Sequence, residues 1–197
     1  MIAFYIYDVN SLLKGVYTGY MLYTGKGDVG TTTLFGCDQQ RISKSSELPE
    51  ALGALDELNA YLGFVKMRSE GKSRITTILR DVQETLFVIQ AEIAGANKKV
   101  EGNAVKRVEE VVNDIEKEIP PLKGFSIAGG TELSALLDIA RTLARRAERR
   151  IIALTDAQVC QTSDEMKAYM NRLSSLLFAL ARLANHLAGV KEETPRY

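Results

Sequence analysis

The sequence has few of the residues on which several common kinds of site depend. Its 197 residues include two cysteines, Cys37 and Cys160, one histidine, His186, and no tryptophan. Two cysteines cannot supply a disulfide framework or a four-thiolate zinc site. A single histidine, near the end of the last helical stretch, leaves no Ser-His-Asp or Cys-His set to assemble. Free thiols suit a reducing compartment, so we expect a cytoplasmic protein.

Long apolar runs and an excess of charge of one sign are also missing. No run approaches the roughly 18 apolar residues of a membrane-spanning helix. Lys plus Arg and Asp plus Glu both number 25, which gives a net charge of zero and argues against a generally basic nucleic-acid-binding protein. We therefore expect neither a membrane nor a nucleic acid as partner. Residues 1–21 have no basic segment ahead of an apolar one, so we expect a peripheral extension and not a signal peptide.

Apolar residues recur with helical spacing from residue 47 almost to the end of the chain. Stripes at i, i+3, i+4 and i+7 predict amphipathic helices, and Thr131 is a suitable N-cap for the fourth of them. Short connections predict antiparallel neighbours. The expected fold is all-α, a bundle of four long helices and one short one in a single domain at 22–190, followed by a tail at 191–197. The predicted helical ranges are 47–65, 75–93, 105–115, 133–154 and 166–187.

Two stretches have no helical spacing and are longer than the connections of such a bundle need to be. Residues 22–46 are rich in Gly, Thr and charge, and contain GKGDVG at 25–30. This matches G-x-G-x-x-G, but no strand–helix–strand unit surrounds it, so it does not predict a dinucleotide site. Successive glycines followed by threonines favour a loop that binds an anion, with a flexible arm as the alternative. The second stretch, 119–130, is also expected to be functional.

The fourth predicted helix carries five arginines within ten residues. At about 100° per residue, Arg141, Arg145 and Arg149 form one stripe beside the apolar face. Guanidinium groups match the geometry of phosphate oxygens, so the stripe predicts a polyphosphate site. The alternative is a solvated surface in which Glu148 and Asp138 pair with the arginines.

Taken together, these segments resemble the PduO-type ATP:cob(I)alamin adenosyltransferases. The resemblance implies a five-helix bundle that forms a homotrimer with active sites between protomers. It also implies transfer of the 5′-deoxyadenosyl group of ATP to cob(I)alamin, with Mg²⁺ on the phosphates. The chain departs from the family pattern in the position of Lys26, in Ala128 and in having only Tyr197 as a C-terminal aromatic residue. The matching segments are YTGKGDVGTTTLFG (23–36), RISK (41–44), EALGALDELNAYLG (50–63), FSIAGGTELSALLDIARTLARRAERR (125–150) and NRLSSLLFALAR (171–182).

The resemblance also implies roles for single residues. Phe125 would lie under the corrin ring and exclude the lower ligand of cobalt, and Asp56 and Arg141 would pair across the subunit interface. Cob(I)alamin is itself the nucleophile, so no protein nucleophile or metal cage is expected. A corrinoid reductase and an adenosylcobalamin-dependent enzyme are the implied partners, and an ATP or corrinoid sensor or a cofactor-delivery module is the alternative function. The implied catalytic residues are Asp56, Phe125, Arg141 and Arg145, and the implied ATP-binding residues are Thr24, Gly27, Asp28, Thr31, Thr32, Lys44, Arg145, Glu148, Arg149 and Asn171.

Overall fold

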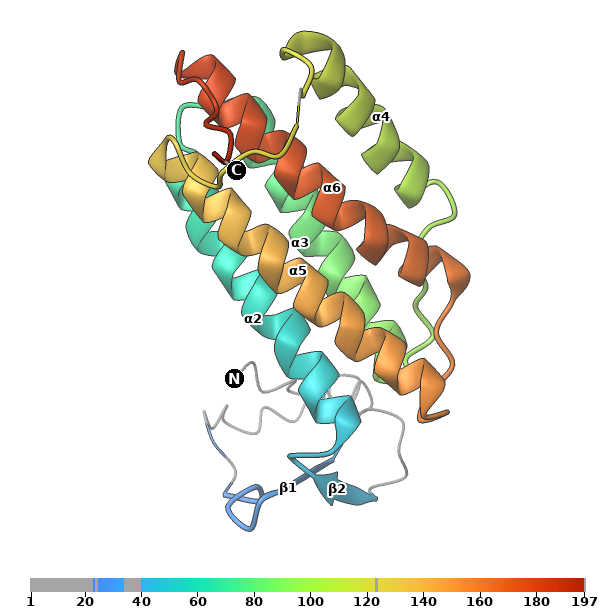
Figure 1. The fold of residues 1–197 in the computed structure, drawn as a ribbon. Coiled ribbons are helices and arrows are strands. Elements are labelled where there is room, and N and C mark those ends of the chain that lie inside the picture. Colours follow the sequence, from blue (N-terminus) through green and yellow to red (C-terminus); the bar gives the residue numbers. More distant parts are fainter. Residues whose placement is uncertain (1–22, 24, 34–39, 123, 197) are drawn as a thin grey trace, which may run out of the picture.

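The computed structural model describes residues 23, 25–33, 40–122 and 124–196. In this part of the chain, five helices form a bundle and two short strands precede it (Figure 1). The five predicted helical ranges are confirmed, and the short helix has 15 residues. No helix among the described residues is long and apolar enough to cross a membrane. The elements are β1 (Thr31–Thr33), β2 (Arg41–Ser43), α2 (Glu47–Arg68), α3 (Ser73–Ile93), α4 (Ala104–Glu118), α5 (Glu132–Asp156) and α6 (Asp164–Leu187).

Local chemistry explains where α5 and α6 begin and where α4 ends. The hydroxyl oxygen of Thr131, the predicted N-cap of α5, accepts a hydrogen bond from the backbone N–H of Ser134 at 3.1 Å. Ser163 caps α6 in the same way, at 3.2 Å. Each cap satisfies a first-turn N–H that has no carbonyl partner within its helix. Pro120 and Pro121 follow the end of α4, because a proline ring cannot continue a helix.

The core lies between the helices and consists mainly of leucine, isoleucine, valine and alanine side chains. α5 packs against α2 and α6, α3 packs on α2, and α4 packs on α6. On α5 the fully buried residues include Ala140, Ala144 and Ala147, whose small side chains let neighbouring helices approach closely. α6 contributes larger side chains such as Leu173 and Leu177, which are also fully buried. Each buried leucine stabilises the fold by about 1.5–3 kcal/mol.

The two strands and the 119–130 link lie at opposite ends of the bundle (Figure 1). Two ion pairs show that α2 and α5 run antiparallel. Arg68 at the end of α2 pairs with Glu132 at the start of α5, at 2.5 Å, and Arg150 late in α5 pairs with Glu50 early in α2, at 3.4 Å. α2 has 22 residues, so these ends are about 33 Å apart at 1.5 Å per residue.

Candidate functional site

A tight glycine turn and a two-stranded antiparallel ribbon precede α2. The turn closes through the N–H of Asp28, which donates to the Gly25 carbonyl at 3.2 Å, and the N–H of Gly30, which donates to the Gly27 carbonyl at 3.1 Å. Gly25 and Gly30 have φ angles of +68° and +77°, a region that glycine adopts without steric cost. The sequence did not predict the strands, because three residues are too few to show a period.

Arg41 on β2 holds this turn against the ribbon. Its guanidinium donates to the carbonyl oxygens of Lys26 and, at 2.8 Å, of Thr31, and its Nε donates to the Thr31 hydroxyl at 2.8 Å. Lys44 covers the turn so closely that a Cβ added to Gly27 would lie 2.8 Å from the Lys44 Nζ. The role of Arg41 was missed because its partners are 10 and 15 residues away in the sequence.

Five of the residues predicted to bind ATP lie in this turn, in the ribbon or directly after it: Gly27, Asp28, Thr31, Thr32 and Lys44. Asp28 and Lys44 are exposed, and Thr31 and Thr32 are half-buried on β1. Thr24 lies outside the described residues. A glycine turn next to hydroxyl groups and an ammonium group provides donors for one bound anion. The geometry of the described residues 25–33 and 40–44 therefore favours an anion-binding loop over a flexible arm.

The arginines of α5 divide into two groups. Arg146 and Arg150 form ion pairs with glutamates of α2, the first of them with Glu57. Arg145 and Arg149, one helical turn apart, are exposed and have no ion pair with another described residue. A salt-bridged surface thus accounts for Arg146 and Arg150, but their partners are glutamates of α2 and not Glu148 or Asp138, the partners considered from the sequence. Arg145 and Arg149 are left to contact a ligand. Two adjacent guanidinium groups of this kind suit a polyphosphate.

Glu148 and Asn171, which the resemblance places in the same pocket, are in contact. The Asn171 Nδ2 donates to the Glu148 Oε1 at 3.1 Å, and its Oδ1 accepts from a guanidinium nitrogen of Arg172 at 2.7 Å. Arg172 also pairs with Glu109 of α4 at 2.8 Å. This chain of contacts orients the Asn171 amide between α5 and α6.

Asp138 connects the arginine stripe to the link that precedes α5. Its Oδ1 accepts from the Arg141 Nε at 3.2 Å, and its Oδ2 accepts from the backbone N–H of Gly129 at 3.3 Å. The Arg141 guanidinium also lies 5.9 Å from the ring centroid of Phe178. Asp56 is half-buried on α2, and its pairing with Arg141 of another protomer stays a prediction.

Phe125 borders a cavity of about 620 Å³ at the end of the bundle away from the ribbon. Phe125 is 77% exposed. The cavity lies between the 119–130 link, the end of α6 and the chain after α6, and its walls include Leu122, Val190 and His186. Cavities of this size accommodate organic ligands, and an exposed aromatic face suits a flat one. The sequence did not predict that His186 lines this cavity.

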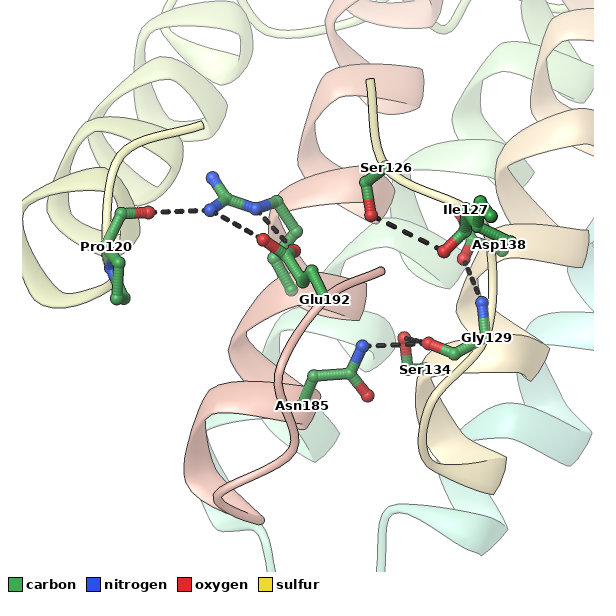
Figure 2. Close-up of polar contacts among 9 residues, drawn as sticks. Pro120, Ser126, Ile127, Gly129, Ser134, Asp138, Asn185 and Glu192 are labelled. Atoms are coloured by element: carbon green, nitrogen blue, oxygen red, sulfur yellow. Dashed lines mark hydrogen bonds and ion pairs between the residues drawn. The ribbon is translucent and has the colours of Figure 1, made fainter. Parts of the chain in front are cut away.

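Asn185, in the last turn of α6, fixes the turn between the link and α5 (Figure 2). Its Nδ2 donates to the Gly129 carbonyl at 2.8 Å. Its Oδ1 accepts from the Thr131 N–H at 2.9 Å. The Ser134 hydroxyl donates to the same Gly129 carbonyl at 3.0 Å. Asn185 was missed from the sequence because these partners lie more than 50 residues away.

The fold and these features define a helical bundle with two sites, an exposed arginine pair whose geometry suits a polyphosphate and a cavity whose exposed aromatic residue suits a flat organic ligand. Within the described ranges, no three His, Cys, Asp or Glu side chains gather closely enough to hold a metal ion. The chain belongs to the cobalamin adenosyltransferase family, because the family model described as "Cobalamin adenosyltransferase" matches residues 22–184.

Known relatives and solved structures agree with this assignment. Corrinoid adenosyltransferase PduO of Salmonella typhimurium is 36% identical over 188 residues, which cover 89% of this chain and 54% of that protein. The corrinoid adenosyltransferase of Bacillus subtilis is 35% identical over 176 residues, covering 86% and 89%. The chain thus spans about half the length of the PduO relatives that it matches. A variant PduO-type ATP:corrinoid adenosyltransferase from Lactobacillus reuteri, complexed with cobalamin and ATP, has a TM-score of 0.83 at 30% identity, covering 89% of this chain and 97% of that chain.

Proposed function

We propose that this protein transfers the 5′-deoxyadenosyl group of ATP to cob(I)alamin, forming adenosylcobalamin and releasing triphosphate. The observation that carries the proposal is the exposed pair Arg145 and Arg149, which has no acidic partner among the described residues and lies on the helix between the ribbon end and the Phe125 end. The names of the relatives support it, as does the similar structure that holds cobalamin and ATP.

The reaction is a displacement in which cobalt supplies the electron pair. Cobalt attacks C5′ of ATP, a cobalt–carbon bond forms, and the C5′–O bond breaks with its electron pair leaving on triphosphate. The protein needs no nucleophile of its own for this step. Its task is to hold the triphosphate, neutralise the charge that develops on the leaving oxygen and align C5′ with cobalt. Mg²⁺ would bind through the phosphates, with few protein ligands.

Each group of residues has a distinct part in this mechanism. The 25–30 turn, with Thr31 and Lys44, binds ATP, and Arg145 and Arg149 hold its triphosphate. Glu148 and Asn171 shape the wall of that pocket. Phe125 occupies the lower face of the corrin ring and keeps the lower ligand from cobalt, which makes reduction of cobalt easier.

We propose that the active site forms between copies of the chain in a homotrimer. In one chain the ribbon and the Phe125 link lie at opposite ends of the bundle, about 33 Å apart by the length of α2. The reaction needs C5′ of ATP within bonding reach of cobalt. A ribbon from one protomer next to the Phe125 end of its neighbour satisfies that need, with Asp56 and Arg141 pairing across the contact.

The chemistry also indicates the neighbouring reactions. A corrinoid reductase must deliver cobalt in its lowest oxidation state, and an adenosylcobalamin-dependent enzyme must take the product. Because the reaction consumes ATP and a strongly reduced corrinoid, we place it in the cytoplasm.

A turnover assay tests the proposal. Cob(I)alamin produced with a chemical reductant is mixed with the protein and Mg·ATP, and its absorbance is followed under anaerobic conditions. We expect the absorbance to fall, with one triphosphate released for each adenosylcobalamin formed and no change when ATP is omitted. Binding of ATP and corrinoid without turnover would contradict the transferase and favour a sensor or delivery module. Sedimentation is expected at three times the 21.7 kDa of one chain, and an active monomer would contradict the shared site.

A further inference from the structure

A buried ion pair joins α6 to the chain that follows it. The Nε of Arg182 donates to the Glu192 Oε1 at 2.7 Å, and its Nη2 donates to the Glu192 Oε2 at 3.1 Å. The Arg182 side chain is only 9% exposed and that of Glu192 is 23% exposed. A guanidinium fork on both oxygens of a carboxylate is a strong and directional contact, and its low exposure reduces screening by water.

The same guanidinium also reaches the 119–130 link. The Nη2 of Arg182 donates to the carbonyl oxygen of Pro120 at 2.6 Å (Figure 2). One side chain of α6 therefore holds the start of the link and residue 192 of the C-terminal segment together. We call this arrangement, formed by Arg182, Glu192 and the Pro120 carbonyl, the clasp.

A second contact fixes the other side of Phe125. The backbone N–H of Ile127 donates to the carbonyl oxygen of Glu193 at 2.8 Å. Phe125 thus lies on a short span between Pro120 and Ile127. Pro120 is joined to Glu192 through Arg182, and Ile127 bonds directly to the next residue, Glu193. Every one of these elements borders the same cavity of about 620 Å³ through at least one residue.

We infer that Arg182 and Glu192 are positioning residues for Phe125, which set the shape of the corrin pocket without touching the reacting atoms. This inference rests on the proposed function. The Nε and Nη2 of Arg182 carry three N–H groups, which match its three hydrogen bonds to Glu192 and Pro120, so its described contacts are structural. Loosening the clasp frees the C-terminal segment and one end of the Phe125 span together, and it leaves the ribbon and the Arg145 region unchanged.

The variant Glu192→Gln tests the clasp because it removes the charge, keeps the shape and changes a residue near the surface. We expect the KM for cobalamin to rise about tenfold, the effect of losing one charge-assisted contact, while the KM for ATP stays within about twofold. Arg182→Lys, which keeps the charge and loses the fork, is expected to shift the cobalamin KM in the same direction. The matched control is Arg107→Gln, which breaks an ion pair with Glu101 at the opposite end of α4.

A spectroscopic measurement distinguishes a role of Glu192 in positioning Phe125 from a general loss of stability. With ATP present, bound cob(II)alamin is examined by visible and electron paramagnetic resonance spectra, which report whether cobalt keeps a lower ligand. We expect Glu192→Gln to increase the fraction that keeps this ligand and Arg107→Gln to match the unchanged protein. Unchanged spectra and KM values in Glu192→Gln, or equal increases in both KM values, would overturn the inference. Absence of turnover in the unchanged protein would instead overturn the proposed function, and the spectra would still report on the clasp.

Discussion

The Oδ1 of Asn185 lies 2.6 Å from the position that a Cβ on Gly130 would occupy. Gly130 has a φ of +109° and the preceding Gly129 has a φ of +115°, so both positions are strained for any other residue. Only Gly130 also faces a close neighbour, since a Cβ on Gly129 would meet nothing within 4 Å. The turn therefore needs its second glycine for two separate reasons.

This difference between the two glycines predicts two stability effects. Gly129→Ala is expected to cost about 1–3 kcal/mol of unfolding free energy through backbone strain alone. Gly130→Ala should cost more, because it also displaces Asn185 from its contacts with Gly129 and Thr131. Denaturant unfolding of both variants measures the difference. Equal losses would mean that Asn185 moves aside without penalty.

Arg145 and its neighbour Arg146 offer a matched pair for testing triphosphate binding. Arg145→Lys keeps the charge and loses the fork that fits phosphate oxygens. We expect kcat/KM for ATP to fall by about two orders of magnitude, or about 3 kcal/mol of transition-state stabilisation. Arg146→Lys, whose parent residue pairs with Glu57, should change it by less than about threefold. Steady-state kinetics with saturating cob(I)alamin gives both values, and similar losses in the two variants would contradict the separation of roles.

The glycine turn predicts an effect on ATP that leaves the fold intact. Asp28 is exposed on the turn and is far from the helical core. Asp28→Asn is expected to raise the KM for ATP strongly and to leave the midpoint of thermal unfolding nearly unchanged. Asp114→Asn, on the exposed face of α4, is the control and should alter neither value. A parallel loss of stability and activity in Asp28→Asn would show that the turn has a structural role.

The proposed contact between Asp56 and Arg141 predicts coupling across the subunit interface. Single changes to Ala should each lower activity, and the double-mutant cycle should show a coupling free energy of roughly 0.5–3 kcal/mol. Arg141 also contacts Asp138 within its own chain. A second cycle with Asp138→Asn therefore measures the intrachain part. Additive effects of the Asp56 and Arg141 changes would exclude the pairing.

Phe125→Ala should affect cobalt chemistry and spare ATP binding. Phe125 is 77% exposed and borders the cavity, so loss of its ring should leave the fold and the α5 arginines intact. We expect a large loss of rate when cob(II)alamin must be reduced on the enzyme, because a lower ligand can return to cobalt. Supplying cob(I)alamin already reduced should restore much of the rate in Phe125→Ala and not in Arg145→Lys. Equal recovery in both variants would argue against separate roles for the link and α5.

The helices could be predicted from the sequence because each one buries a continuous apolar stripe. The stripe from Leu133 to Leu154 lies within the observed α5, and the cap at Thr131 follows from its hydroxyl group. The strands could not be predicted in this way, because Thr31–Thr33 is too short to show alternation. The two strands pair through their backbone, and the Arg41 side chain adds contacts that depend on the folded turn.

The candidate site could be predicted only in part, because several of its side chains contact residues that are distant in the sequence. Spacing alone puts five arginines on α5, but only the antiparallel packing of α2 shows that Arg146 and Arg150 are already paired. Arg182 stands within an apolar stretch of α6 and has no local sequence signal, since its acceptors are 10 and 62 residues away. Asp138, considered only as a surface partner of the arginines, also bonds to the Gly129 turn.

The separation of the ribbon and the Phe125 link within one chain has a genetic consequence if the trimer forms as proposed. Each chain would then lend its ribbon to one active site and its link to another. A mixed trimer could contain one chain with a defective ribbon and another with a defective link. It would still form one active site, from the intact link of the first chain and the intact ribbon of the second. Two alleles that are each inactive alone would in this way complement each other in a cell that carries both.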